Sequence, residues 1–351
     1  MLDPRTLEGK VWQGDCMEVT ADWPDGCLDH IVTSTPYPQG GSPGTRKRTL
    51  SPEREAMLIQ KRGRALGYRA VRPEEGISGF THGKPNLKGE TGLQVRIAAR
   101  DWLDWFLGIA AGLKRLLKPN GNFVLNVDSC CFPTRHRHWG VCSLPERMEA
   151  VGWCFADHWI WVKPNGAPTK APGRFTHSWE HIYVFSNGDR WRWNVDGARA
   201  PHKGDWTGRK ATSYGTDRAI WHGSDMADPN PLGAKPSDVL IYPVGGSRWQ
   251  HLGGAHFAPM PLPLAEDLVR RVSQEGELVF DPFAGAGTTL VACIRQGRRW
   301  VGTEITEEAC TIAERRIQLA TQGFMDEELL PDIAQQGLVF ADRAEAEESG
   351  A

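Results

Sequence analysis

The sequence lacks the features of membrane and secreted proteins. No apolar run approaches the roughly 20 residues that a membrane-spanning helix needs, and the N-terminus has no signal-peptide pattern. The eight cysteines include no CxxC pair, which argues against a disulfide scaffold and a structural zinc site. We therefore expect a cytoplasmic protein with reduced thiols and no bound metal, although several metal-ligating residues lie close together in the sequence: Cys130, Cys131, His136, His138 and Cys142.

The chain also lacks a large net charge, but its charges are unevenly distributed. The formal net charge of −2 combines a basic segment with an acidic tail. Residues 41–100 hold 13 Lys and Arg against five Glu, whereas residues 324–351 hold eight acidic residues and one Arg. The basic segment favours a polyanionic partner, which the total charge conceals.

Apolar patterns predict strands that alternate with helices. Short segments rich in apolar residues predict strands at 30–33, 122–127, 159–162, 181–185, 278–280 and 300–304. Helical spacing predicts helices at 102–117, 144–151, 261–273, 288–295 and 307–320. This alternation indicates an α/β fold, with a doubly wound, Rossmann-like sheet that carries helices on both faces. Residues 37–100 and 187–235 lack periodicity and are predicted to be irregular insertions.

A glycine-rich loop between the strand at 278–280 and the next helix predicts a nucleoside cofactor site. The loop and the start of the helix run from Asp281 to Thr289 and contain Pro282, Phe283, Gly285, Gly287 and Thr288. Small residues allow close approach of a ligand, and the helix N-terminus offers free N–H groups. No Lys follows Gly287, which argues against a phosphate loop of the NTP-binding type. The third glycine of a dinucleotide fingerprint is also missing, which argues against a dinucleotide site. Glu304 follows the next strand, where a carboxylate can accept the hydroxyls of a ribose.

A second candidate site follows the strand at 30–33. The residues are Ser34, Thr35, Pro36 and Tyr37, about 245 residues before the glycine loop. A serine hydroxyl and a backbone carbonyl, of Thr35 or Pro36, can each accept a hydrogen bond from an exocyclic amine, and Tyr37 can stack on the ring that carries it. The turn should lie at the carboxyl edge of the sheet, where ligands bind in open α/β folds.

Together these motifs resemble the β group of amino-methylating DNA methyltransferases, in which the catalytic motif precedes the cofactor motif. The family patterns are (Asp/Asn/Ser)-Pro-Pro-(Tyr/Phe/Trp) and Phe-x-Gly-x-Gly. The similarity extends to Leu116–Gly121, to Trp161–Asn165, to Trp179–Ile182, to His256–Pro261 and to Arg299–Glu304. Thr35 departs from the pattern, because the family has proline there.

The resemblance implies S-adenosylmethionine as cofactor, double-stranded DNA as substrate and a target base that is flipped out of the duplex. It implies catalytic roles for Ser34, Thr35, Pro36 and Tyr37, and cofactor contacts from Asp15, Asp281, Pro282, Phe283, Gly285, Gly287, Thr288 and Glu304. Serine at the first motif position resembles the N4-cytosine enzymes. An N6-adenine enzyme and an inactive DNA-binding protein on the same scaffold are the alternatives. A cognate restriction endonuclease and a homodimer are left open.

The resemblance also divides the chain into four parts. Residues 1–186 form the catalytic half of the methyltransferase domain and contain the basic insertion 41–100. Residues 187–245 form the target-recognition region, and residues 246–323 form the cofactor-binding half. The acidic tail 324–351 follows them.

Overall fold

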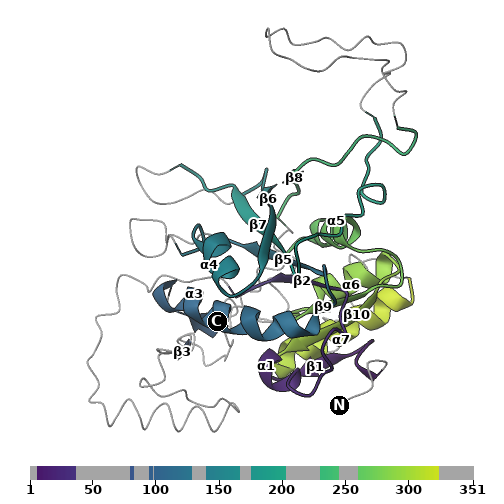
Figure 1. Cartoon of the computed structure of the whole chain (residues 1–351). Helices are drawn as coiled ribbons and strands as arrows, with labels where there is room; N and C mark the ends of the chain where they lie inside the picture. The colour runs from purple at the N-terminus through teal and green to yellow at the C-terminus, as the bar shows by residue number, and fades with distance from the viewer. Residues whose placement is uncertain are drawn as a thin grey trace, which may run out of the picture.

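The computed structural model describes residues 6–36, 80–82, 95–97, 99–128, 140–166, 175–202, 230–244 and 260–323, which build a sheet covered by helices on both faces (Figure 1). The eight strands are ordered β1-β10-β9-β2-β5-β7-β6-β8. Their bounds are β1 Val11–Gln13, β2 His30–Ser34, β5 Asn122–Val127, β6 Cys154–Val162, β7 Trp179–Ser186, β8 Val239–Ile241, β9 Leu278–Asp281 and β10 Arg299–Glu304. Strands β1, β10, β9, β2 and β5 are parallel to one another, and β7 runs antiparallel to both of its neighbours. The predicted α/β architecture is confirmed.

The helices divide the buried side chains into two layers. Helices α1 (Cys16–Val19), α3 (Ala99–Leu113) and α4 (Leu144–Ala150) pack with Ile31 and Phe123 on one face. Helices α5 (Leu262–Val272) and α6 (Thr288–Arg295) pack with Val32 and Val124 on the other, where α7 (Glu307–Thr321) adjoins α6. A 3₁₀ turn (Lys114–Leu116) ends α3. Because alternate residues of a strand face opposite sides, β2 and β5 contribute to both layers. No helix in the described ranges is long and apolar enough to cross a membrane.

The structure adds elements that the apolar patterns did not predict. Strands β1 and β8 are three residues long and lie at the two edges of the sheet. A separate antiparallel pair, β3 (Phe80–His82) and β4 (Val95–Ile97), lies within the segment 37–100, which was predicted to be a partly ordered insertion. Short strands carry too few residues to show a period, so sequence patterns miss them.

The connections place a topological switch point between β9 and β2. These strands are neighbours at the centre of the sheet, with Ile31 paired to Phe280. From β9 the chain passes through α6 to β10 on one side, and from β2 through α3 to β5 on the other. In open α/β sheets, ligands bind at such a switch point, outside the carboxyl ends of the strands. Both predicted motifs begin at this edge.

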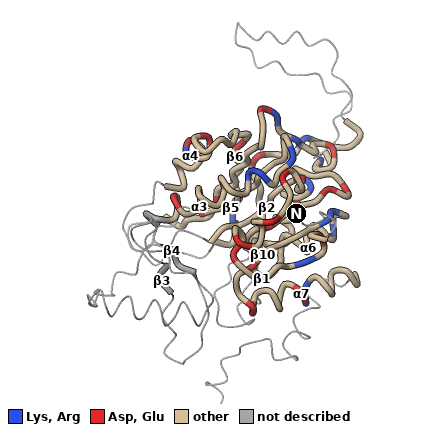
Figure 2. Tube along the Cα trace, turned by 60° about the horizontal axis from the view of Figure 1, so that its bottom comes forward, with Lys and Arg blue, Asp and Glu red and all other residues tan. Residues whose placement is uncertain are grey.

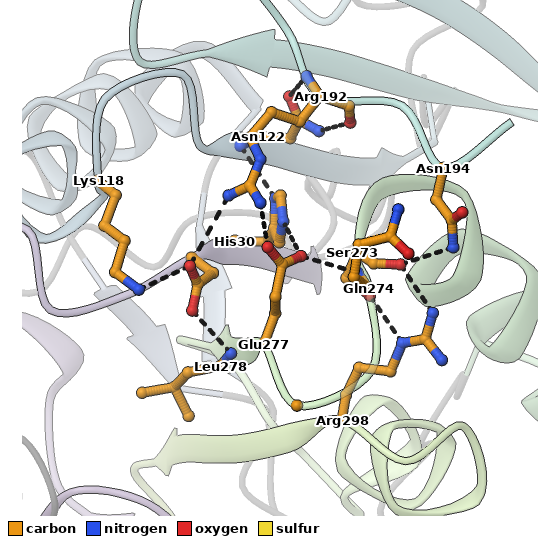
Figure 3. Close-up of polar contacts among 12 residues, drawn as sticks. His30, Lys118, Asn122, Arg192, Asn194, Ser273, Gln274, Glu277, Leu278 and Arg298 are labelled. Carbon is orange, nitrogen blue, oxygen red and sulfur yellow. Dashed lines mark hydrogen bonds and ion pairs between the residues drawn. The ribbon is translucent and has the colours of Figure 1, made fainter. Parts of the chain in front are cut away.

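The opposite, amino edge of the sheet is held by a network of charged groups (Figure 3). His30 Nε2 lies 3.0 Å from Glu277 Oε2, and its Nδ1 accepts the Asn122 N–H. Arg192 forms an ion pair with Glu277, and Lys118 Nζ lies 2.7 Å from Asp29 Oδ1.

Burial lowers the pKa of His30. Burial alone would raise the pKa of Glu277, but the hydrogen bond with His30 and the Gln274 N–H outweigh it and lower that pKa to about 2. The network joins the starts of β2 and β5 to the residue that precedes β9.

Candidate active site

The Ser-Thr-Pro turn leaves the carboxyl end of β2 and is fixed by helix α3. Ser34 is the last residue of β2, and Thr35 is 2% exposed. The Trp102 indole Nε1 donates to the Pro36 carbonyl at 2.7 Å, and the Thr35 hydroxyl donates to the same oxygen at 3.3 Å. The Pro36 carbonyl is therefore already engaged by the protein. Tyr37 lies outside the described residues.

Helix α3 contacts both motifs. The Trp102 ring stacks on Phe106 with centroids 5.3 Å apart, which holds the indole that donates to the turn. One helical turn further along, Trp105 packs against Phe283 of the glycine loop with centroids 5.6 Å apart. The sequence pattern identified these tryptophans only as core residues of a helix. Their indoles in fact contact the turn and the loop, so that helix α3 packs against both motifs.

Asp281 connects the two motifs directly. Its Oδ1 accepts the Thr33 hydroxyl hydrogen at 2.6 Å and the Phe283 N–H at 3.0 Å. Thr33 belongs to β2 and Phe283 to the loop, so one buried oxygen links the strand of the turn to the cofactor loop. Burial raises the pKa of Asp281 to about 6, against the opposing hydrogen bonds from Thr33 and Thr289. The side chain was predicted to contact the cofactor, but it is 3% exposed and faces partners within the protein.

Two glycines give the loop its shape. Gly285 has φ +51 and Gly287 has φ +78, in the left-handed region that disfavours other residues. A Cβ on Gly287 would lie 2.9 Å from the Cβ of Ala313 in α7, so the loop can pass this helix only with a glycine. Gly287 then caps α6, whose first residue Thr288 is buried and accepts from Arg316 Nη1 at 3.0 Å. Thr288 thus connects the end of the loop to Arg316 of α7.

Glu304 ends β10 beside the loop. Its Oε2 accepts the Gly285 N–H at 2.9 Å, and its Oε1 accepts the Thr306 N–H at 2.9 Å and the Thr306 hydroxyl hydrogen at 3.0 Å. A carboxylate offers about four acceptor positions, so the acid retains capacity for a ligand hydroxyl. Its backbone carbonyl accepts the Gly14 N–H at 2.8 Å, which brings Asp15 beside it. Asp15 caps α1 through the Met17 N–H at 2.8 Å. Thr306 was not predicted from the sequence.

The charge predictions are tested only in part. Lys, Arg, Asp and Glu interleave over the described tube (Figure 2). Most of the basic segment, the acidic tail and four of the clustered residues, Cys130, Cys131, His136 and His138, lie outside the described residues. Within the described ranges, no three His, Cys, Asp or Glu side chains are grouped as a metal site would need.

The fold and the site define a class of protein. A switch point at the centre of the sheet, flanked by a glycine loop and with an acid at the end of the next strand, fits a cofactor that carries a ribose. The first motif adds a turn with hydroxyl and carbonyl acceptors on the neighbouring strand. This combination is typical of methyltransferases that use S-adenosylmethionine.

The chain belongs to the family of amino-methylating DNA methyltransferases. The N6_N4_Mtase family model, described as DNA methylase, matches residues 28–315. The chain is therefore a DNA methyltransferase that uses S-adenosylmethionine, and its motif order is that of the β group.

Relatives agree with this assignment, and solved structures share the fold. The chain is 26% identical to the Type II methyltransferase M.XycI of Xanthomonas campestris pv. cyanopsidis over 90% of both sequences. It is 25% identical to M.Cfr9I of Citrobacter freundii, again over 90% of both. The fold is similar to that of the PvuII DNA methyltransferase (cytosine-N4-specific), with a TM-score of 0.58 and 17% identity over 95% of both chains. It is also similar to a DNA modification methylase of Thermus thermophilus complexed with S-adenosyl-L-methionine, with a TM-score of 0.50 and 22% identity over 90% of this chain and 97% of that chain.

Proposed function

We propose that this chain methylates the exocyclic N4 of cytosine in double-stranded DNA at a specific sequence. The observation that carries the base assignment is Ser34 at the first position of the turn, at the carboxyl end of β2. The PvuII enzyme, whose fold is similar, is described as cytosine-N4-specific, which supports the same choice. Since its substrate is DNA and the two relatives named above come from bacteria, we place the protein in the cytoplasm of a bacterial cell.

In this proposal the target cytosine is flipped out of the duplex toward the switch point between β9 and β2, because the amine is inaccessible within the stack. Ser34 Oγ and the Thr35 carbonyl accept the two amine hydrogens. The Pro36 carbonyl is not used, because Trp102 already donates to it at 2.7 Å. Tyr37 stacks on the base. These contacts orient the nitrogen lone pair, so catalysis rests mainly on positioning.

The residues around the glycine loop fit the cofactor. Gly285 and Gly287 provide close backbone approach, Phe283 and Pro282 provide apolar surface, and Glu304 accepts the ribose hydroxyls. When bound, S-adenosylmethionine supplies a methyl group on a positively charged sulfur. Ser34 Oγ and the Thr35 carbonyl would hold the cytosine amine toward that methyl group, and the proton that the amine loses on methylation would leave to water.

Three further side chains lie beside the glycine loop. Asp15, next to Glu304 in the fold, is proposed to contact the adenine. Asp281 and Thr288 are proposed to position the loop, because both are buried and partnered within the protein.

The division of the chain into functional parts is also part of this proposal. We assign residues 1–186 to the catalytic half and 246–323 to the cofactor-binding half. We assign phosphate contacts to the insertion 41–100 and target readout to 187–245. The first described part of that region, 187–202, begins at the amino edge of the sheet, where Arg192 bonds Glu277 and Asn122. We therefore assign the readout to later residues of the region.

The assay is transfer of labelled methyl groups from S-adenosylmethionine to bacterial DNA, followed by digestion and identification of the labelled nucleoside. We expect N4-methylcytosine. Ser34→Ala should lower the rate about 10- to 100-fold, the value of a hydrogen bond to a group that becomes charged. Ser143→Ala is the matched control, because this hydroxyl donates to Gly140 O at 3.1 Å at the start of α4. Label in N6-methyladenine would overturn the base assignment, and no label with cofactor binding intact would support an inactive DNA-binding protein.

A further inference from the structure

A row of polar side chains crosses the carboxyl edge of the sheet, starting at Ser34. Ser34 is paired in register with Asn126 of β5, which is itself paired with Ile182 of β7. Val32, Val124 and Ile182 pack in the layer of α5. Since strand residues two apart share a face, Ser34 and Asn126 lie on this face as well.

Two further strands extend the row. On the same face, Glu180 of β7 precedes Ile182 by two residues, and Lys163 directly follows β6. Asn126 Nδ2 donates to Glu180 Oε2 at 3.0 Å, and Lys163 Nζ donates to Glu180 Oε1 at 2.9 Å. Strands β2, β5, β7 and β6 lie side by side in this order (Figure 1). The row is therefore Ser34, Asn126, Glu180 and Lys163.

The row contains a buried ion pair. The side chains of Lys163 and Glu180 are 11% and 7% exposed, and Asn126 is fully buried. Removing such charges from water costs several kcal/mol per ion, and apolar residues of similar volume would often stabilise a fold equally well. A purely structural role therefore gives little reason for a lysine and a glutamate at this edge.

The chemistry of Glu180 fixes the orientation of the Asn126 amide. A carboxylate and a backbone carbonyl can only accept hydrogen bonds. Asn126 Nδ2 faces two such groups, Glu180 Oε2 and the His181 carbonyl at 3.2 Å. The amide nitrogen must therefore face β7, which turns the Oδ1 acceptor away from that strand.

We propose that Asn126 positions the Ser34 hydroxyl when the target base is bound. A serine oxygen can accept an amine hydrogen in a fixed direction only if its own hydrogen is directed elsewhere. Neighbouring strands of a sheet lie about 4.8 Å apart. Asn126 Oδ1, on the strand next to that of Ser34, accepts that hydrogen. Glu180 and Lys163 hold the amide in the required orientation. This inference rests on the proposed function and applies equally to a cytosine or an adenine amine.

Exchanging the two polar groups tests the inference. Asn126→Asp places two carboxylates together, and Glu180→Gln allows the Asn126 amide to turn around. In the double variant, the amide introduced at position 180 can donate to the carboxylate introduced at position 126, whose other oxygen again accepts from Ser34. We therefore expect each single variant to lower the single-turnover rate about 10- to 100-fold at saturating DNA and cofactor, with little change in DNA affinity. The double variant should be several-fold faster than the slower single variant, because the hydrogen bond between positions 126 and 180 is restored, although the His181 carbonyl loses its donor.

Asn122→Asp is the matched control. Asn122 lies on the same strand and face but at the amino edge, where its Nδ2 donates to the Arg192 carbonyl. This variant should lose stability and keep the single-turnover rate. Asn126→Ala provides a second test if Asn126→Asp does not fold, and it should lose rate to a similar extent.

Three results would count against the inference. Wild-type rates in both single variants, or a double variant as slow as the slower single, would overturn it while the proposed function stands. No methyl transfer by the wild-type protein would overturn the proposed function and this inference together.

Discussion

Replacing Asp281 with asparagine separates the charge of this side chain from its role as a connector. Asp281 Oδ1 accepts from Thr33 Oγ1 at 2.6 Å and from Phe283 N at 3.0 Å, and an asparagine oxygen can accept the same two hydrogens. Burial, the largest contribution, raises the pKa of Asp281 from 3.8 to about 6. Asp281→Asn should therefore retain the geometry and remove the ionisation.

The sign of the stability effect follows from this raised pKa. Because the folded protein holds the proton more tightly than the unfolded chain, the stability that this group contributes is present at low pH and is lost as the pH rises through about 6. A shift of about two pH units corresponds to about 3 kcal/mol. The variant should thus equal wild type near pH 3, exceed its unfolding free energy by about 1.5 kcal/mol at pH 5 and by about 3 kcal/mol at pH 7.

Urea denaturation of both proteins between about pH 4.5 and 8 measures this difference. The titration of all other groups cancels to first order when the two curves are subtracted. A difference that does not change with pH would show that the pKa of Asp281 is not raised by folding. Asp281→Ala is the comparison for geometry: it removes both hydrogen bonds and should lower methyl transfer, whereas Asp281→Asn should retain most of it.

Three other substitutions test the support of the turn and the loop. Trp102→Phe keeps the aromatic stacking but leaves the Pro36 carbonyl without its 2.7 Å donor, so the unfolding free energy should fall by about 1–3 kcal/mol in thermal denaturation. Its methyl-transfer rate should fall with it, and an unchanged rate would show that this bond does not position the turn. Gly287→Ala should lower stability by about 2–5 kcal/mol, from left-handed strain and from a Cβ contact of 2.9 Å with Ala313. Glu304→Gln should weaken S-adenosylmethionine binding about 10- to 100-fold by calorimetry, and unchanged affinity would exclude a ribose contact.

Sequence patterns predicted the interior of the fold well, for a physical reason. Strands at 122–127 and 278–280 are buried on both faces, so they appear as short segments rich in apolar residues. Edge strands β1 and β8 are short and partly exposed, which leaves no such signal. The helix at 288–295 was predicted with its observed bounds, because Gly287 and its neighbours mark where the helix begins.

The site was predictable only where its residues are close in sequence or at a fixed spacing. The glycine loop, the turn and Glu304 are of this kind. The Trp102 bond to Pro36 joins residues 66 positions apart, and the bond between Asn126 and Glu180 joins residues 54 positions apart. Such contacts depend on the order of strands in the sheet, which local patterns do not specify. The inward orientation of Asp281 likewise depends on its pairing with Thr33 of a different strand.

The central claim is that this site methylates the amine of cytosine. Its most direct test is mass spectrometry of nucleosides from DNA of bacterial cells that express the chain, compared with cells that express Ser34→Ala. We expect N4-methylcytosine in the first DNA and its loss or strong reduction in the second. N6-methyladenine in place of N4-methylcytosine would contradict this claim.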